Sequence, residues 1–165
     1  MKIRLAEVND SPTVATLILE LVAEVSAPGT LSDSTQHLTA VARALLSSAT
    51  VWALLAESDA GEVVGVLTLN ECAAICAGGR FGEISEMYVQ PSFRSQGVGK
   101  NLVGAAVKFG RSREWTRLEV GAPPVPPWAR TCAFYRRIGF EESGSRLKLV
   151  LRSSTGKLSG QTTNV

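Results

Sequence analysis

The sequence has 165 residues, 45% hydrophobic and 19% charged, and 17 basic against 15 acidic side chains give a net charge of +2. This length suits one globular domain with its own core, and the hydrophobic fraction excludes an intrinsically disordered chain. No basic block stands out, so no nucleic-acid or membrane-surface partner is indicated.

The first elements are a strand and two helices. Residues 2–7 alternate charged and apolar side chains, which is typical of a short strand. Asp10, Ser11 and Pro12 predict a helix start, and apolar residues at helical spacing continue to Val25. A second helix is expected from about Asp33 to Ser48.

The middle of the chain is predicted to be a set of strands. Residues 50–56 and 62–69 are two apolar runs around the turn at 58–61, which indicates an antiparallel hairpin. Residues 72–80 end in two glycines and are expected to be a loop. Residues 83–89 form a further strand that stops before Pro91.

A glycine-rich turn at residues 94–99 then opens an amphipathic helix. The last elements are a strand at 117–120, a stiff proline-rich loop at 123–127, a helix at 128–138, and two short strands with Leu147, Leu149 and Leu151 on one face. The order β-α-α-β-β-β-α-β-α-β predicts an α/β (α+β) fold in one domain over residues 1–152, followed by a flexible tail at 153–165.

The cysteines and the N-terminal residues indicate whether the protein binds a metal and in which compartment it works. Cys72, Cys76 and Cys132 cannot all pair with one another, and with a lone His37 they supply no zinc ligand set, so no metal is expected. Acidic residues near the start and the lack of a long apolar run favour a cytoplasmic protein without a membrane segment. The low charged fraction favours a surface covered by a second copy, hence a homodimer.

The turn at 94–99 carries the first chemical signal. Gly97 and Gly99 at a helix start present backbone N–H groups that suit a phosphate, and Arg94 and Lys100 flank them. A Walker loop and a dinucleotide fingerprint are excluded, because the positions that need glycine hold Arg94 and Leu102. An ordinary strand-to-helix connection remains the alternative for this turn alone.

Two segments resemble the signatures of GNAT-type N-acetyltransferases. Residues 83–99 (EISEMYVQPSFRSQGVG) resemble the central motif, a strand and a proline followed by Arg/Gln-x-x-Gly-x-Gly/Ala at a helix start. Residues 133–140 (AFYRRIGF) resemble the second signature, and residues 118–120 are similar to the strand between them. The resemblance covers about residues 1–151 in element order. It implies a mixed, mostly antiparallel sheet whose parallel strands at 83–89 and 117–121 splay into a cofactor wedge.

The resemblance implies an acetyl-CoA-dependent N-acetyltransferase that modifies a primary amine, on a small molecule or a peptide, by direct attack and without a metal. The backbone of Met87, Tyr88 and Val89 would bind the pantetheine arm, and its N–H groups would polarise the thioester. The pyrophosphate would lie on the turn made of Arg94, Ser95, Gln96, Gly97, Val98, Gly99 and Lys100.

The resemblance also implies the catalytic groups. Tyr135 matches the family's general acid, although a core aromatic residue is the alternative. The base is one of Glu83, Glu86 and Glu119, or an ordered water. Strand alternation sends Glu83 and Glu86 to opposite faces unless a bulge intervenes, so the pattern leaves this choice open.

Two departures from the family pattern bear on function. Ser95 stands where many members have glycine, and Trp128 stands where members usually have an asparagine that binds the pantetheine. Trp128 either shapes the cleft or anchors a surface loop. A non-catalytic CoA-binding sensor or interaction domain is therefore the alternative function, and a nucleotide-binding protein that uses residues 94–100 is a third.

Overall fold

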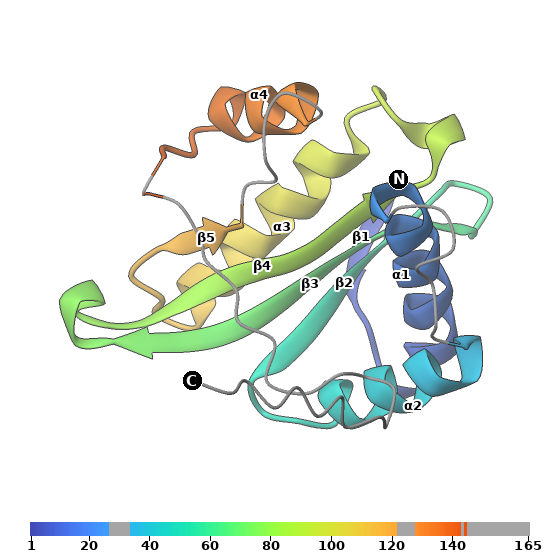
Figure 1. The fold of residues 1–165 in the computed structure, drawn as a ribbon, viewed down its shortest axis with the longest axis horizontal. Helices are drawn as coiled ribbons and strands as arrows, with labels where there is room; N and C mark the ends of the chain where they lie inside the picture. Colours follow the sequence, from blue (N-terminus) through green and yellow to red (C-terminus); the bar gives the residue numbers. More distant parts are fainter. Residues whose placement is uncertain (27–33, 122–127, 143, 145–165) are drawn as a thin grey trace, which may run out of the picture.

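The computed structural model describes residues 1–26, 34–121, 128–142 and 144. One sheet holds five strands side by side in chain order: β1 (Lys2–Leu5), β2 (Val51–Glu57), β3 (Val63–Ala74), β4 (Gly79–Val89) and β5 (Leu118–Val120). The strands from β1 to β4 pair antiparallel, and β4 pairs parallel with β5. This arrangement, drawn in Figure 1, confirms the predicted mixed and mostly antiparallel sheet.

Four α-helices flank the sheet: α1 (Ser11–Val25), α2 (Thr35–Leu46), α3 (Val98–Ser112) and α4 (Ala129–Arg137). Adjacent residues of β2 enter different cores, because side chains alternate along a strand. Leu55 packs with Val14 and Leu17 of α1, whereas Leu54 packs with Leu102 of α3. The helices therefore cover both faces of the sheet and leave the ends of β4 and β5 to be bordered by several elements at once.

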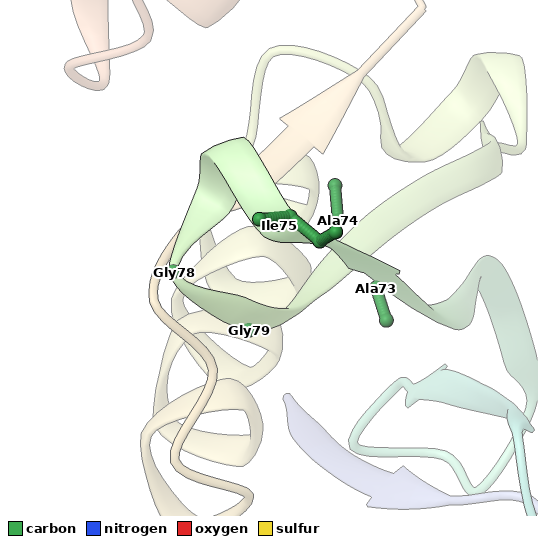
Figure 2. A pocket seen from close by; sticks show the side chains of 5 residues that line it. All are labelled: Ala73, Ala74, Ile75, Gly78 and Gly79. Carbon is green, nitrogen blue, oxygen red and sulfur yellow. The ribbon is translucent and has the colours of Figure 1, made fainter.

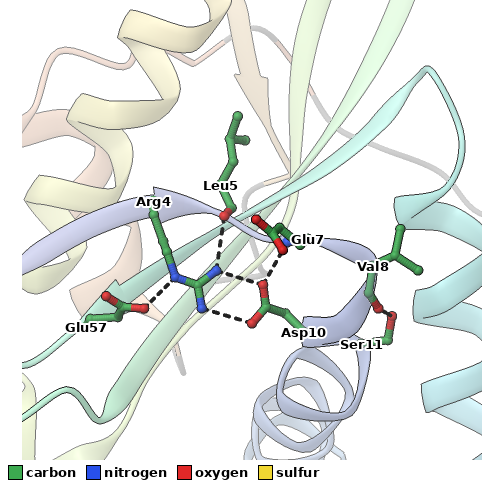
Figure 3. A network of polar contacts seen from close by, with 7 residues as sticks. All are labelled: Arg4, Leu5, Glu7, Val8, Asp10, Ser11 and Glu57. Atoms are coloured by element: carbon green, nitrogen blue, oxygen red, sulfur yellow. Dashed lines mark hydrogen bonds and ion pairs between the residues drawn. The ribbon is translucent and has the colours of Figure 1, made fainter.

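Polar contacts of Arg4 join the first strand to the first helical segment and to β2 (Figure 3). The guanidinium donates to both carboxylate oxygens of Asp10 at 2.7 and 2.9 Å, and it also bonds Glu57. Asp10 in turn accepts from the backbone N–H of Glu7 at 2.7 Å. The hydrogen bond from Arg4 holds the pKa of Asp10 below its usual range. The network fixes the entry into α1, whose other end borders the cleft described below.

The prediction of a loop over residues 72–80 is wrong, because most of this segment belongs to two strands. β3 runs to Ala74 and β4 begins at Gly79, with a short 3-10 helix, Ile75–Ala77, between them. The ladder continues through the pairs Cys72↔Phe81 and Ala74↔Gly79, so the backbone groups of this stretch bond across the hairpin. The two glycines make only the final turn, with φ values of 72° at Gly78 and 136° at Gly79.

The tip of this hairpin is built from small side chains and one exposed isoleucine. Figure 2 shows Ala73, Ala74 and Ile75 with Gly78 and Gly79 around a shallow hollow of about 440 Å³. Ile75 is fully exposed there, at 102%. The hollow has no charged lining residue and lies at the far end of β4 from its cleft-lining residues.

The element order β-α-α-β-β-β-α-β-α up to α4 agrees with the prediction. The predicted proline-rich loop, the final pair of strands and the tail at 153–165 lie outside the described residues. In the part of the chain that the structure describes, no helix has both the length and the apolar character needed to cross a membrane.

Candidate active site

A cleft of about 1140 Å³ opens where five elements meet. Its walls come from the last turn of α1, the end of β4, the residues that end β5, the start of α3 and one face of α4. The lining includes Leu21, Glu24, Val25, Ser85, Glu86, Met87, Tyr88, Val89, Gly97, Gly99, Lys100, Val120, Trp128, Phe134 and Tyr135. The cleft therefore brings together both motifs singled out in the sequence.

Within the described residues, no strand pairs with one edge of β4 where it borders the cleft, and this edge is called the open edge. β5 pairs with β4 only from Gly82 to Ile84 and ends at Val120, whereas β4 continues to Val89. Gln90 donates its N–H to Val64 on β3 at 3.0 Å. Because backbone groups alternate along an antiparallel strand, the N–H and C=O groups of Tyr88 also face β3, and those of Met87 and Val89 face the open edge. Met87 and Val89, two of the three residues predicted to bind the pantetheine arm, thus have backbone groups that face the side of β5.

A β-bulge decides which glutamates share a face of β4. Leu67 on β3 pairs with Met87, but Leu69 pairs with Ile84, so Ser85 and Glu86 together oppose Thr68. Ile84 and Met87 consequently both join the core beneath α3. Glu83 and Glu86 are therefore both on the other face of the sheet, which resolves the alternative that the sequence pattern left open.

The parallel register adds the third glutamate to the same face. Glu119 on β5 lies opposite Glu83 on β4, and paired residues of neighbouring strands point to the same side. Arg117 binds Glu119 at 2.6 Å, and the Cys72 thiol lies 3.8 Å from Glu83. Neither carboxylate lines the cleft.

Glu86 is the member of this trio that lines the cleft. Its backbone N–H donates to the Thr68 hydroxyl at 3.0 Å, and the same hydroxyl donates to its carboxylate. Burial raises the pKa of Glu86 above its usual value, because a desolvated carboxylate is less stable than the neutral acid. Such a carboxylate accepts a proton more readily than an exposed one.

Tyr135 reaches the cleft from α4 while its ring belongs to the core. The side chain is 8% exposed and packs edge-on against Phe134 and Phe140, with centroids 5.2 and 5.3 Å away. Its hydroxyl lies 4.0 Å from the Met87 sulfur, beside the open edge of β4. Burial raises the pKa of Tyr135 to about 12, so the phenol keeps its proton at neutral pH.

The start of α3 presents N–H groups that lie ahead of its first intrahelical hydrogen bond. Gly97 is the N-cap at φ 84°, and the first intrahelical bond runs from Asn101 N–H to Gly97 O at 3.0 Å. The N–H groups of Val98, Gly99 and Lys100 precede that bond. The first turn carries no acidic side chain, and Lys100 adds a positive charge where the macrodipole already is positive. This combination favours an anion at the helix start.

The backbone conformation and the close packing of the turn at residues 94–99 restrict which side chains fit there. Ser95 adopts φ 62°, a left-handed backbone in which glycine is less strained than serine. A Cβ added to Gly99 would lie 3.4 Å from Phe134 Cζ, so α3 and α4 approach each other closely here. Gln96 donates its side-chain amide to Ser92 O at 2.8 Å, within the turn.

Several cleft residues were not identified from the sequence as site residues. Arg130 and Arg137 of α4 line the cleft, as does Phe134. Glu24 lines it from α1 and bonds Arg94, whose side chain was expected to face phosphate. Helical spacing places Leu21, Glu24 and Val25 together, but only the packing of α1 on β4 brings them to the cleft. Trp128 also lines the cleft, which supports a role in its shape.

Within the described residues, no group of three or more histidine, cysteine or acidic side chains is placed to hold a metal ion. The cleft chemistry is thus that of backbone N–H groups, a buried phenol, the half-buried carboxylate of Glu86, the carboxylate of Glu24 and a few cations.

Comparison with known proteins gives a consistent family. The model of the acetyltransferase (GNAT) family matches residues 20–140. An uncharacterized N-acetyltransferase of Methanocaldococcus jannaschii is 35% identical over 60 residues, which are 36% of this chain and 26% of that relative, so the match spans about a quarter of the relative's length.

Two solved structures extend the likeness to nearly the whole chain. A ribosomal-protein-alanine N-acetyltransferase from Brucella melitensis biovar Abortus 2308 is 25% identical, with a TM-score of 0.70 over 92% of this chain and all (100%) of that one. An aminoglycoside N-acetyltransferase in complex with CoA shares the fold at 19% identity, with a TM-score of 0.70 over 93% of this chain and 95% of the other.

Proposed function

The chain belongs to the acetyltransferase (GNAT) family, and we propose that it moves the acetyl group of acetyl-CoA to a primary amine by direct attack. One observation carries the proposal: a single cleft joins an anion-ready helix start, an open strand edge and a buried tyrosine hydroxyl. Family membership and the names of the relatives support N-acetyltransfer as the reaction class.

The described residues fit acetyl-CoA without a metal. The N–H groups of Val98, Gly99 and Lys100, which begin α3, suit the pyrophosphate. The backbone groups of Met87 and the N–H of Val89 on the open edge suit the amides of the pantetheine arm. Lys100, Arg130 and Arg137 line the cleft and offset the negative charge of the phosphates.

The acetyl group arrives as a thioester, which is reactive toward a neutral amine. A backbone N–H on the open edge stabilises the charge that develops on the thioester oxygen. The amine nitrogen bonds to the carbonyl carbon and loses a proton to Glu86, directly or through water. The C–S bond breaks, and Tyr135 donates its phenolic proton to the departing sulfur.

The choice of Glu86 as base follows from its position. It lines the same cleft as Tyr135, whereas Glu83 and Glu119 lie on the same face outside the lining. Water remains the alternative carrier of the proton. The acceptor itself is proposed only as a primary amine, on a small molecule or a peptide.

Thermal unfolding with acetyl-CoA, CoA and magnesium ATP tests the cofactor. A ligand at about 100 times its Kd adds about 2.7 kcal/mol to the free energy of unfolding, a shift of several degrees. We expect acetyl-CoA and CoA to raise Tm, and ATP to leave it unchanged. A rise with ATP alone would support the nucleotide-binding alternative and contradict the proposal.

Turnover is tested separately with a panel of amines and detection of released CoA. Acetylation of at least one amine is expected. If the protein binds CoA but releases no CoA from acetyl-CoA with any small-molecule or peptide amine of the panel, a non-catalytic CoA-binding domain is favoured instead.

A further inference from the structure

The side chain of Arg94 is held by β4 and α1, not by α3. Its Nε donates to the Val89 carbonyl at 2.8 Å, and its Nη2 donates to Glu24 Oε1 at 2.6 Å. Its Cζ lies 5.3 Å from the centroid of the Tyr88 ring. The sequence places Arg94 in the phosphate turn, but these contacts connect that turn to two other walls of the cleft.

Glu24 stands where helix electrostatics disfavours a carboxylate. It lies in the last turn of α1, which carries no basic side chain, and the macrodipole there is negative. Arg94 offsets that charge from outside the helix, and the Tyr88 hydroxyl donates to the same oxygen at 3.3 Å. A charge placed against local preference at the edge of a cleft is typical of a functional constraint.

Global stability does not account for this pair. The side chains of Glu24 and Arg94 are 38% and 43% exposed, and exposed ion pairs contribute only about 0–1 kcal/mol. What Arg94 adds is geometry, because its planar group binds a strand carbonyl and a helix carboxylate at the same time. Leu21, Glu24 and Val25 line the cleft, so the geometry of the pair sets the position of that wall.

On the basis of the proposed function, we infer that Arg94 is a positioning residue: through Glu24 it holds the last turn of α1 against the end of β4 and the cofactor turn. The phosphates then rely on the N–H groups of α3 and on other cations, while Arg94 transmits the order of the occupied turn to the α1 wall.

Hydrogen–deuterium exchange on the full chain, with CoA as the probe, tests this inference. The variants are Arg94→Gln, Glu24→Gln and the double variant, and Arg94→Lys keeps the charge but loses the planar group. Glu20→Gln is the matched control, because Glu20 lies one turn earlier on α1 and is not a partner of Arg94. Exchange is followed over residues 17–25 and 98–104, and the Kd of CoA is measured by calorimetry.

In the unmodified chain and in Glu20→Gln, CoA is expected to slow exchange in both segments. In Arg94→Gln and Glu24→Gln, slowing is expected at residues 98–104 but not at 17–25, and the double variant adds nothing further. Their Kd for CoA should stay within about fivefold, the range of an exposed ion pair. In Arg94→Lys, the slowing of exchange at residues 17–25 should be intermediate between that of the unmodified chain and that of Arg94→Gln.

Two outcomes overturn the inference. One is unchanged slowing at residues 17–25 in the Arg94 and Glu24 variants. The other is a loss of CoA affinity beyond about tenfold in Arg94→Gln together with tighter binding in Glu24→Gln, as for a charged phosphate ligand that Glu24 withholds.

Failure of the proposed function has a different signature. If the unmodified chain does not bind CoA, the acetyl-CoA proposal fails. Hydrogen–deuterium exchange at residues 17–25 without ligand still tests whether Arg94 and Glu24 hold the last turn of α1 in place. Faster exchange there in Arg94→Gln and Glu24→Gln, but not in Glu20→Gln, supports the positioning role, and equal exchange in all of them contradicts it.

Discussion

Glu86, which is half-buried, and Tyr135, which is buried, both line the cleft and come from elements almost fifty residues apart in the chain. Burial raises the pKa of each, and the chemical consequences are opposite. The phenol stays protonated and remains a proton donor over the physiological range, whereas the carboxylate becomes a better proton acceptor. In the proposed reaction, these properties suit Tyr135 as the acid and Glu86 as the base.

Replacement of Tyr135 by Phe removes the proposed proton donor and keeps the ring in the core. We expect kcat to fall by about a hundredfold or more, the usual size of general acid catalysis. CoA affinity should not change, because among the described residues the hydroxyl has only a 4.0 Å contact, to the Met87 sulfur. Equal turnover in Tyr135→Phe and the unmodified chain would remove Tyr135 from the mechanism.

Replacement of Glu86 by Gln tests the base and its pKa. The acidic limb of kcat/KM is expected above the usual range of a carboxyl group, because the folded pKa is raised, and it should disappear in Glu86→Gln. Since a raised pKa means that the ionised form costs stability above the pKa of the unfolded chain, this variant should also unfold at a higher temperature at neutral pH.

Glu83→Gln and Glu119→Gln are the controls for the Glu86 variant. Both carboxylates share its face of the sheet without lining the cleft, so both variants should retain the acidic limb. If Glu119→Gln loses that limb and Glu86→Gln keeps it, the base is on β5.

The sheet and α3 are locked together at the far end of β4 by one tryptophan. Trp115 packs over Gly82 of β4 and Gly110 of α3, and its indole N–H donates to Glu71 at 2.7 Å. Trp52 and Phe109 complete the aromatic cluster. Because β4 also carries cleft residues, this packing anchors the strand whose other end lines the cleft.

Two glycine substitutions should have opposite effects on stability. A Cβ at Gly82 would lie 2.2 Å from the Trp115 ring, so Gly82→Ala should lower the free energy of unfolding by about 1–3 kcal/mol through overpacking. Gly104 lies on the exposed side of α3 with no atom within 4 Å of an added Cβ, so Gly104→Ala should raise it by up to about 1 kcal/mol. Urea unfolding measures both, and equal values would contradict this account of the packing.

Elements set by local sequence rules were predictable, whereas those set by pairing with a distant strand were not. The helices α1, α3 and α4 follow from local rules: a proline in the first turn, a glycine N-cap and a glycine that stops the helix. The strand extension over residues 72–80 was missed, because small side chains carry no alternation and pairing across the hairpin decides it. The sequence left a bulge in residues 83–89 open, because the bulge at Ser85 and Glu86 is defined by its partner Thr68 on another strand.

Charge is unevenly distributed over the cleft of the whole molecule. Lys100, Arg130 and Arg137 line it from α3 and α4, whereas Glu86 lines it from β4 and Glu24 from α1, where Arg94 offsets the charge of Glu24. Positive charge thus gathers at the helices that would hold the phosphates, and the negative charge of Glu86 lies at the sheet.

Two adjacent arginines on α4 test this distribution. Arg137 lines the cleft, whereas Arg136 binds Glu142 outside the lining. Arg137→Gln is expected to weaken CoA binding and to reduce its sensitivity to salt, because one cation near the phosphates is lost. Arg136→Gln should bind CoA as the unmodified chain does. Calorimetry at two salt concentrations separates the variants, and equal effects would mean that only net charge matters.

By itself, the sequence determined the order of the elements up to α4, the glycine-rich start of α3 and the family signatures, because these depend on spacing along the chain and on backbone preference. Only the tertiary structure decided that Glu83, Glu86 and Glu119 share one face, that Glu86 lines the cleft, and that Arg94 turns to Glu24. These outcomes depend on strand register and helix packing, which join residues far apart in the chain and leave no local pattern.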